Sequence, residues 1–141
     1  MIDQRTGSIH IADDIAIGHN DNFDYIKNLN LGQKQEIWYV KNGVIWITER
    51  NIKIEEQYFI ISFAFFEEKL NTIVFVLSDE PSALESTGWD NYSEIKERED
   101  AKKYDAWLTN EIGSEREFKW GRVYASYDPK SGGSSIGIVY E

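Results

Sequence analysis

Apolar residues recur at every second position in several short runs of this chain, and this period predicts β-strands. Isoleucines alternate with other residues across 9–11 and 15–17, and the pair Asp13-Asp14 between these runs supplies a turn. The longest alternating run spans 58–66, and one of its sides carries Phe59, Ile61, Phe63 and Phe65. We expect that side to face the core, because successive side chains point to opposite faces of a strand.

The pair Asn42-Gly43 is the clearest turn signal, because both residues accept the positive φ angles of a type I′ hairpin turn. A two-residue loop at this pair fixes the register of the strands on either side. With the run 58–66 and another strand at 72–77, the hairpin predicts a four-stranded meander. The predicted register pairs Val40 with Ile45 and Trp38 with Ile47 on one face of the hairpin. It pairs Tyr39 with Trp46 on the other face.

Two helices and a closing hairpin are predicted besides the meander. A short helix begins after the Asn-Asp-Asn run at 20–22, which offers N-caps, and ends near Gly32. A long helix spans about 90–112, because acidic residues precede basic ones by four positions and Gly113 follows its end. Strand signals on both sides of a turn at 128–133 predict the closing hairpin.

These elements predict one α+β domain that spans residues 1–141. We expect a largely antiparallel sheet, made of the meander plus hairpins at both ends of the chain, with the two helices packed on it. The 41% hydrophobic and 14% aromatic content excludes a disordered protein and suffices for a core. No repeat, linker or low-complexity tract divides the sequence.

Acidic residues outnumber basic ones, with Asp+Glu 25 against Lys+Arg 15 and a formal net charge of -10. Such a surface repels nucleic acids, because their phosphates carry the same sign of charge. It attracts basic proteins and accelerates association with them. We therefore expect a basic protein as the partner and no nucleic-acid partner.

The sequence also bears on the compartment and on cofactors. No secretory signal is visible, because residues 1–7 lack a basic region followed by an apolar run. The apolar stretches are too short and too interrupted to cross a bilayer, which takes about 20 apolar residues. The chain contains no cysteine, which excludes disulfides, thiolate metal sites and cysteine nucleophiles. We expect a cytoplasmic protein with no membrane partner and no cofactor.

Catalytic and metal-binding patterns are sparse. The two histidines, His10 and His19, lie near Asp13 and Asp21 in the sequence. A metal site would need these side chains to converge, and we expect His10 to point away from its isoleucine neighbours. Paired carboxylates fall in predicted turns or on a solvated helix face, and the glycine-rich run 131–134 lacks the ending of a phosphate-binding loop. We predict no catalytic residue and no metal ligand.

Aromatic residues of the two hairpins are the best candidates for a binding surface. Tyr39, Trp46 and Tyr124 are expected on the sheet face opposite the main core. Two interpretations stay open: either the long helix buries these rings, or they form a protein-contact surface, where tyrosine and tryptophan are common. An aromatic surface ringed by carboxylates would suit a basic protein. We therefore take Tyr39, Trp46, Tyr124 and Asp128 as candidate binding residues.

Four segments of the C-terminal part of the chain have a recognisable pattern: Gly-Trp-Asp-Asn-Tyr-Ser-Glu at 88–94, Tyr-Asp-Ala-Trp-Leu at 104–108, Phe-Lys-Trp-Gly at 118–121 and Tyr-Asp-Pro-Lys-Ser-Gly at 127–132. In these segments the chain resembles a set of small acidic bacterial proteins. That set is similar to the immunity proteins of bacterial toxin systems in size, acidity and lack of catalytic residues. The resemblance covers somewhat under half of the chain, implies a non-enzymatic protein that binds a toxin, and assigns no functional residue.

The leading hypothesis is therefore a non-enzymatic protein of the immunity type that occludes the active site of a basic toxin. One alternative is a small hydrolase-like enzyme with a carboxylate, such as Asp128 or Glu94, in a cleft of the sheet. A concave polar pocket with a shifted carboxylate pKa would favour that alternative. The second alternative to the immunity hypothesis is a small-ligand carrier or a component of a larger assembly. An enclosed apolar cavity or a symmetric apolar edge would favour this alternative.

Overall fold

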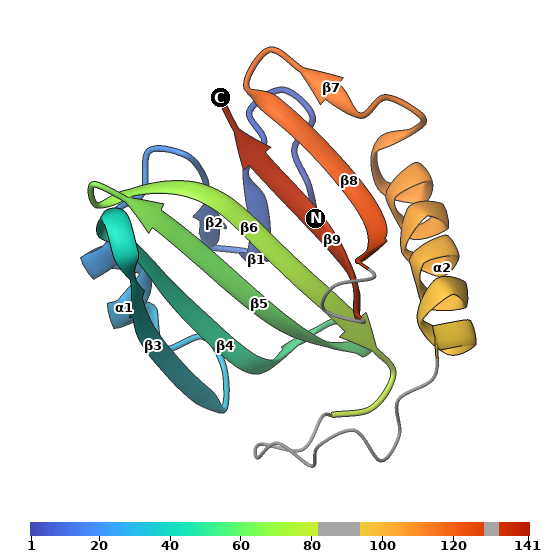
Figure 1. Cartoon of the computed structure of the whole chain (residues 1–141), viewed down its shortest axis with the longest axis horizontal. Helices are drawn as coiled ribbons and strands as arrows, with labels where there is room; N and C mark the ends of the chain where they lie inside the picture. The colour runs from blue at the N-terminus through green and yellow to red at the C-terminus, as the bar shows by residue number, and fades with distance from the viewer. Residues whose placement is uncertain (82–93, 129–132) are drawn as a thin grey trace.

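The computed structural model describes residues 1–81, 94–128 and 133–141, except for the side chains of 94–97 and 128. Within these ranges, two helices and a small hairpin accompany a seven-stranded sheet (Figure 1). The strands are β1 (Ile9–Ala12), β2 (Ile15–Ile17), β3 (Lys34–Val40), β4 (Val44–Ile54), β5 (Gln57–Phe66), β6 (Lys69–Ser78), β7 (Glu117–Phe118), β8 (Gly121–Asp128) and β9 (Gly133–Tyr140). The helices are α1 (Phe23–Leu29) and α2 (Glu94–Ile112), and a 3-10 turn, η1 (Lys41–Gly43), joins β3 to β4.

The large sheet has the strand order β3-β4-β5-β6-β9-β8-β7, and its strand pairs are antiparallel. Strands β3 to β6 form the predicted meander, and the closing hairpin β8–β9 joins it through β9. The N-terminal hairpin β1–β2 forms a separate sheet and lies behind the large one in Figure 1. The predicted α+β fold with a largely antiparallel sheet is confirmed.

The two faces of the large sheet differ in what packs on them. One face, here named the core face, carries the alternating residues of β5, and Phe59, Ile61, Phe63 and Phe65 are all buried. Ile26 of α1, Leu108 and Ile112 of α2 and isoleucines of the β1–β2 hairpin belong to the same core. Both helices and the small hairpin therefore pack on the core face. The opposite face is named the open face.

Strands β3 and β4 form the predicted hairpin in a different register. Asn42 and Gly43 adopt the expected positive φ angles, 70° and 78°, but Lys41 joins them in a three-residue turn. The predicted pairing of Tyr39 with Trp46 is therefore wrong, because one extra loop residue moves one strand by one position and changes which residues share a face. The observed pairs are Tyr39 with Ile45, Trp38 with Trp46 and Val40 with Val44.

The predicted start of α1 and the predicted end of α2 are confirmed, whereas α1 ends at Leu29 and not near Gly32. The Asn22 side chain caps α1 by accepting a hydrogen bond from the Tyr25 N–H at 2.9 Å, and Asn30 ends this helix in the left-handed conformation, with φ 48°. Gly113 follows α2 with φ 78° and donates its N–H to the Thr109 carbonyl. The predicted start of the long helix near residue 90 lies outside the described residues.

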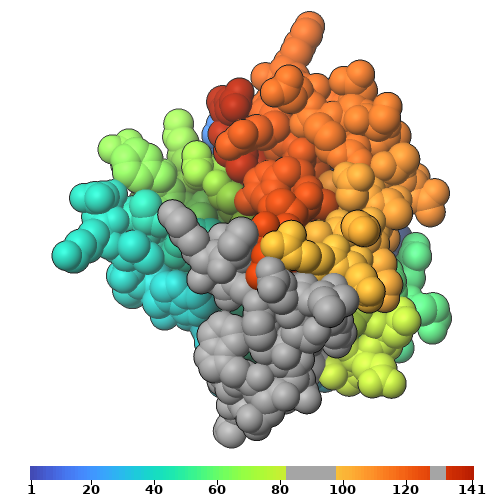
Figure 2. Space-filling model, turned by 45° about the vertical axis from the view of Figure 1, so that its right-hand side comes forward, coloured from blue at the N-terminus to red at the C-terminus, as the bar shows by residue number. Residues whose placement is uncertain are grey.

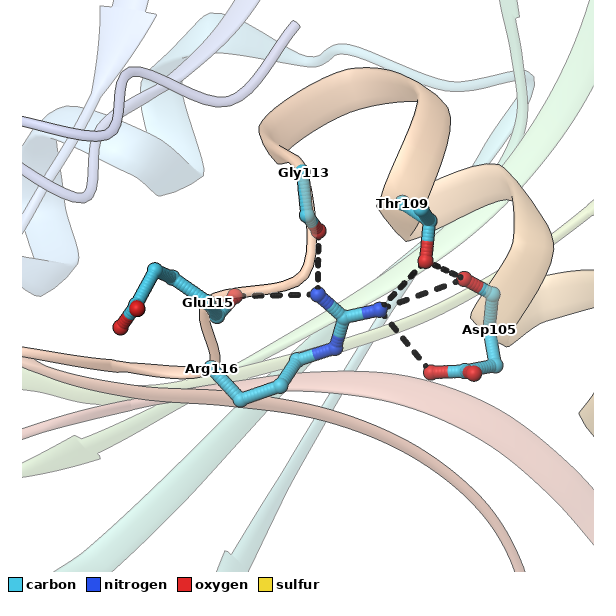
Figure 3. Close-up of polar contacts among 5 residues, drawn as sticks. All are labelled: Asp105, Thr109, Gly113, Glu115 and Arg116. Carbon is cyan, nitrogen blue, oxygen red and sulfur yellow. Dashed lines mark hydrogen bonds and ion pairs between the residues drawn. The ribbon is translucent and has the colours of Figure 1, made fainter.

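The Arg116 side chain forms hydrogen bonds that link the end of α2 to the segment leading into the following strands (Figure 3). One guanidinium nitrogen, Nη1, donates to the carbonyl oxygens of Gly113 at 2.6 Å and Glu115 at 2.9 Å. The other, Nη2, donates to the Thr109 hydroxyl at 2.9 Å and to Asp105, through Oδ1 at 3.0 Å and the carbonyl oxygen at 3.3 Å. A cation at the C-terminus of a helix also interacts favourably with the helix dipole.

We expect Arg116→Ala to lower the free energy of unfolding by about 1–2 kcal/mol, because helix-end carbonyl groups lose their donor. Arg116→Lys should recover only part of this loss, since an ammonium group lacks the planar fork. Denaturant titration measures both values. Arg122→Ala, which removes an exposed arginine on neighbouring β8, is the control and should cost little. Equal costs for Arg116→Ala and Arg122→Ala would contradict the role given to Arg116.

Candidate functional site

The four predicted binding residues do not form one cluster. Trp46 lies on the open face of β4, half-buried, whereas Tyr39 lies on the other side of edge strand β3 and is 74% exposed. Tyr124 belongs to the open face of β8, and its ring lies against Gly137 of β9 so closely that a Cβ at 137 would overlap it. Asp128 ends β8, and its side chain lies outside the described side chains.

The β3–β4 hairpin brings together most of the large apolar side chains that are exposed in the described part of the chain. Trp38, Val40 and Phe66 are exposed by 43%, 48% and 49%, and they lie on the open face with half-buried Trp46. We name these four residues and Tyr39 the hairpin patch. Figure 2 shows this end of the molecule, in cyan, projecting at the left. Clustered exposed apolar side chains are typical of protein-contact sites.

Sequence reasoning missed Trp38, Val40 and Phe66 as members of this surface. The two-residue loop had placed Trp38 and Val40 on the same face as Ile47. Phe66 carried a usable signal, because it follows core residue Phe65 directly and adjacent strand residues point to opposite faces.

The long helix does not bury these aromatic rings. Trp107 of α2 packs edge-on against Phe59 and Phe75, with ring centroids 6.3 and 5.7 Å apart, and both phenylalanines belong to the core face. The described part of α2 therefore lies on the face opposite Trp46. Of the two interpretations of the aromatic residues, burial beneath α2 is wrong.

The charges beside the hairpin patch are mixed, whereas the sequence had suggested a ring of carboxylates. On the open face, Glu36 accepts from Arg50 at 2.8 Å and lies 3.8 Å from the Lys34 ammonium. Exposed Glu67 and Glu68 form the turn after Phe66, and Lys41 and Lys69 flank them in the described hairpin ends. The excess of acid is therefore concentrated elsewhere on the molecule.

Glu49 is a buried acid beneath the start of β3, with 0% of its surface exposed. Its Oε1 accepts a hydrogen bond from Gln35 Nε2 at 2.6 Å, and its Oε2 accepts from the Gly32 N–H at 3.1 Å. Gln35 Nε2 also donates to the Lys27 carbonyl oxygen at 2.9 Å. Desolvation raises the pKa of Glu49, although these two donors oppose the shift. The carboxylate thus links β4 to β3 and to the loop after α1, and Gln35 connects this group to α1, so we assign Glu49 a structural role.

This raised pKa predicts a pH dependence of stability. The folded state holds the proton of Glu49 more tightly than the unfolded state does. The contribution of Glu49 to the free energy of unfolding is therefore most favourable below the ordinary pKa of this group, about 4.3. This contribution is lost as the pH rises through the folded-state pKa. We expect the unfolding free energy of the wild type, minus that of Glu49→Gln, to be larger at low pH than at neutral pH. Denaturant titrations across this range measure the difference. A difference that grows with pH would show that the two donors outweigh desolvation.

The two histidines lie apart from each other, and only His10 lines a groove with carboxylates, namely Asp13, Glu55 and Glu111. His10 is exposed on β1, as predicted, and the His19 ring stacks on Tyr140 with centroids 5.2 Å apart. Asp21 Oδ2 accepts from the Gly18 N–H at 2.8 Å and thereby stabilises a turn. Among residues 1–81, 94–128 and 133–141, no three His, Asp or Glu side chains are grouped so that they could hold a metal ion.

We expect the thermal unfolding midpoint to be the same with and without a chelator, because the apolar core holds the fold together. Differential scanning calorimetry of the protein before and after EDTA treatment measures this. A midpoint lowered by many degrees after chelation would instead assign a metal to the region of His10, His19, Asp13 and Asp21.

The surface also contains grooves. One, of about 600 Å³, lies between the β1–β2 turn, the β4–β5 turn and α2, and its lining includes Asp13, Glu55 and Trp107. Glu49, whose pKa is raised, is not part of this lining. Glu94, the other carboxylate considered for an enzyme, belongs to α2, but its side chain lies outside the described ones.

Comparison with solved structures finds the same fold in another protein. The chain is similar to a chain of the solved complex of Rhs1-CT with its cognate immunity protein RhsI1. The TM-score is 0.56 and the sequence identity 16%, and the match covers 99% of this chain and 86% of that chain. No protein-family model and no curated protein matches the sequence. None of the described helices has the length and apolar content to cross a membrane.

Proposed function

We propose that this chain is a non-enzymatic binding protein of the immunity type, which binds a basic toxin in the cytoplasm and occludes its active site. The hairpin patch is the observation that carries the proposal. Trp38, Val40 and Phe66 are exposed on the open face beside half-buried Trp46, and Tyr39 is exposed on the other side of edge strand β3, so a partner that grips this edge of the sheet can reach all five. Tryptophan and tyrosine are the residues that most often anchor protein interfaces.

The fold and the charge agree with this proposal. A chain that shares the fold belongs to a complex between Rhs1-CT and a cognate immunity protein, so the fold occurs in a system of this kind. The net charge of -10 favours rapid association with a basic partner. Inhibition by occlusion requires a complementary surface and no catalytic group on this chain, which agrees with the dispersed positions of its histidines.

Among the four predicted residues, we propose Trp46 and Tyr39 as members of the partner surface. Tyr124 lies on the same face as Trp46 but four strands farther along the sheet, on β8. A partner that covered the open face from β4 to β8 would contact Trp46 and Tyr124 together. Tyr124 and Asp128 are therefore proposed as peripheral contacts.

The reading frame next to the gene that encodes this chain provides the test of the immunity function, because toxin and immunity genes act as pairs. Expression of the neighbouring product alone should stop the growth of a bacterial host, and co-expression of this chain should restore growth. The two products should also elute together in size-exclusion chromatography. A neighbouring product that is harmless, or that remains toxic when this chain is present in excess, would contradict the proposal.

A further inference from the structure

The groove beside Trp107 continues into a second groove on the other side of the same residue. The first has a volume of about 600 Å³ and the second about 340 Å³, and both are lined by Gln57 and Trp107. We name the combined depression the Trp107 trough. It lies between α2 and the ends of β4, β5 and β6, at the other end of these strands from the hairpin patch. Figure 2 shows α2 in gold, the end of β6 in yellow-green and the β4–β5 turn in green on the right-hand side.

The centre of the trough is apolar and firmly held. Phe59 and Trp107 line the first groove, and Leu77, Tyr104 and Trp107 line the second. The Trp107 ring is half-buried and packs edge-on against Phe59 and Phe75, at interplanar angles of 65° and 78°. An indole with fixed edges and a partly exposed surface can bind the alkyl stem or the cationic head of a basic side chain.

Carboxylates predominate around this centre. Five line the two grooves: Asp13, Glu55, Asp79, Asp100 and Glu111. Exposed Asp14, Glu56 and Glu80 directly follow three of them in the sequence. The opposing cations in the lining are Lys53, Lys103 and the Met1 ammonium, which lies 2.9 Å from Glu111. Among the described residues, carboxylates therefore exceed cations around the trough, in contrast to the mixed charges beside the hairpin patch.

We infer that the Trp107 trough docks a basic segment of the protein partner, with an arginine or lysine against Trp107 and its charge among the surrounding carboxylates. The inference rests on the proposed function, and it assigns the attraction for a basic partner to this end of the molecule. Charge complementarity selects the occupant, because a second copy of this chain would bring more negative charge. A guanidinium suits the site best, since it stacks on aromatic rings and pairs with carboxylates through two nitrogens.

A hexa-arginine peptide is a suitable probe, and the indole N–H signal of Trp107 in an NMR titration is the readout. Trp107→Phe identifies that signal among the five tryptophans. We expect a saturable shift of the Trp107 signal, and an increase of about fivefold in the peptide Kd for the exposed double variant Glu55→Gln/Asp79→Asn. The control, Glu67→Gln/Glu68→Gln, removes the same charge at the hairpin end and should change the Kd less than twofold.

Three outcomes would overturn the inference: a Trp107 signal that does not shift, equal weakening by the two double variants, or shifts confined to the hairpin patch. A Trp107 signal that does not shift means that the peptide does not occupy the trough. Equal weakening means that binding follows net charge alone, and shifts confined to the hairpin patch mean that the peptide prefers that surface. Partner binding separates this inference from the proposed function. If the neighbouring gene product binds with unchanged affinity to Glu55→Gln/Asp79→Asn, only the docking site is wrong. If the peptide occupies the trough and no toxin is found, only the immunity function is wrong.

Discussion

Replacing Phe63 by alanine is expected to lower the free energy of unfolding by about 3–5 kcal/mol, which is the usual cost of removing a buried aromatic ring. Phe63 lies in the middle of β5 on the core face, with 0% of its surface exposed. It is opposite Ile47 on one neighbouring strand and Ile73 on the other, so the lost ring leaves a cavity between three strands. Urea titration of the wild type and the variant measures the difference.

Glu99→Ala is the control for Phe63→Ala, because Glu99 is exposed on α2. We expect this change to alter stability by no more than about 0.5 kcal/mol. Equal losses for the two variants would mean that the core face of β5 or the exposed side of α2 has been assigned wrongly.

The second large effect is expected on the rate at which a purified partner dissociates from the hairpin patch. Trp38→Ala should speed dissociation about 30-fold, equivalent to about 2 kcal/mol, as is common for a central tryptophan of an interface. Tyr25→Ala is the matched control, because Tyr25 of α1 is exposed by the same 43% but lies outside the patch. Surface plasmon resonance measures both rates. Two variants with the same dissociation rate as the wild type would exclude the patch from the interface.

Electrostatic attraction should affect the rate of association with the partner and not the rate of dissociation. If the acidic surface steers a basic partner, the association rate should fall as salt rises, because the Debye length is only about 8 Å at physiological ionic strength. The Trp38→Ala variant should show the same salt dependence as the wild type, since it changes no charge. An association rate that does not depend on salt would contradict the basic character proposed for the partner.

Much of the fold could be predicted because local signals agree with the tertiary structure. Alternation in β5 identified the buried phenylalanines, the Asn-Asp-Asn run at 20–22 identified the start of α1, and Gly113 identified the end of α2. The register of the β3–β4 hairpin could not be predicted in the same way. Both a two-residue and a three-residue loop place Asn42 and Gly43 at positive φ, so the turn residues do not distinguish between them.

The candidate site was less predictable, because its position depends on contacts between distant segments. The sequence could not show that α2 packs on the core face, which leaves Trp46 without a helix above it in the described structure. It also could not show that Trp107, which lies beside the apolar stripe of α2, borders two grooves together with Gln57 at the start of β5. Glu49 resembles a surface residue in the sequence, and its burial depends on contacts with the loop at Gly32 and with Gln35 of β3.

The most direct test of the proposed function is to titrate the purified product of the neighbouring reading frame with this chain while recording the activity that stops growth. We predict that the wild type and Tyr25→Ala abolish the activity at one equivalent, and that Trp38→Ala does so only in large excess. Activity that persists at saturating wild-type protein would contradict occlusion. Equal inhibition by all three proteins would show that inhibition does not depend on the hairpin patch.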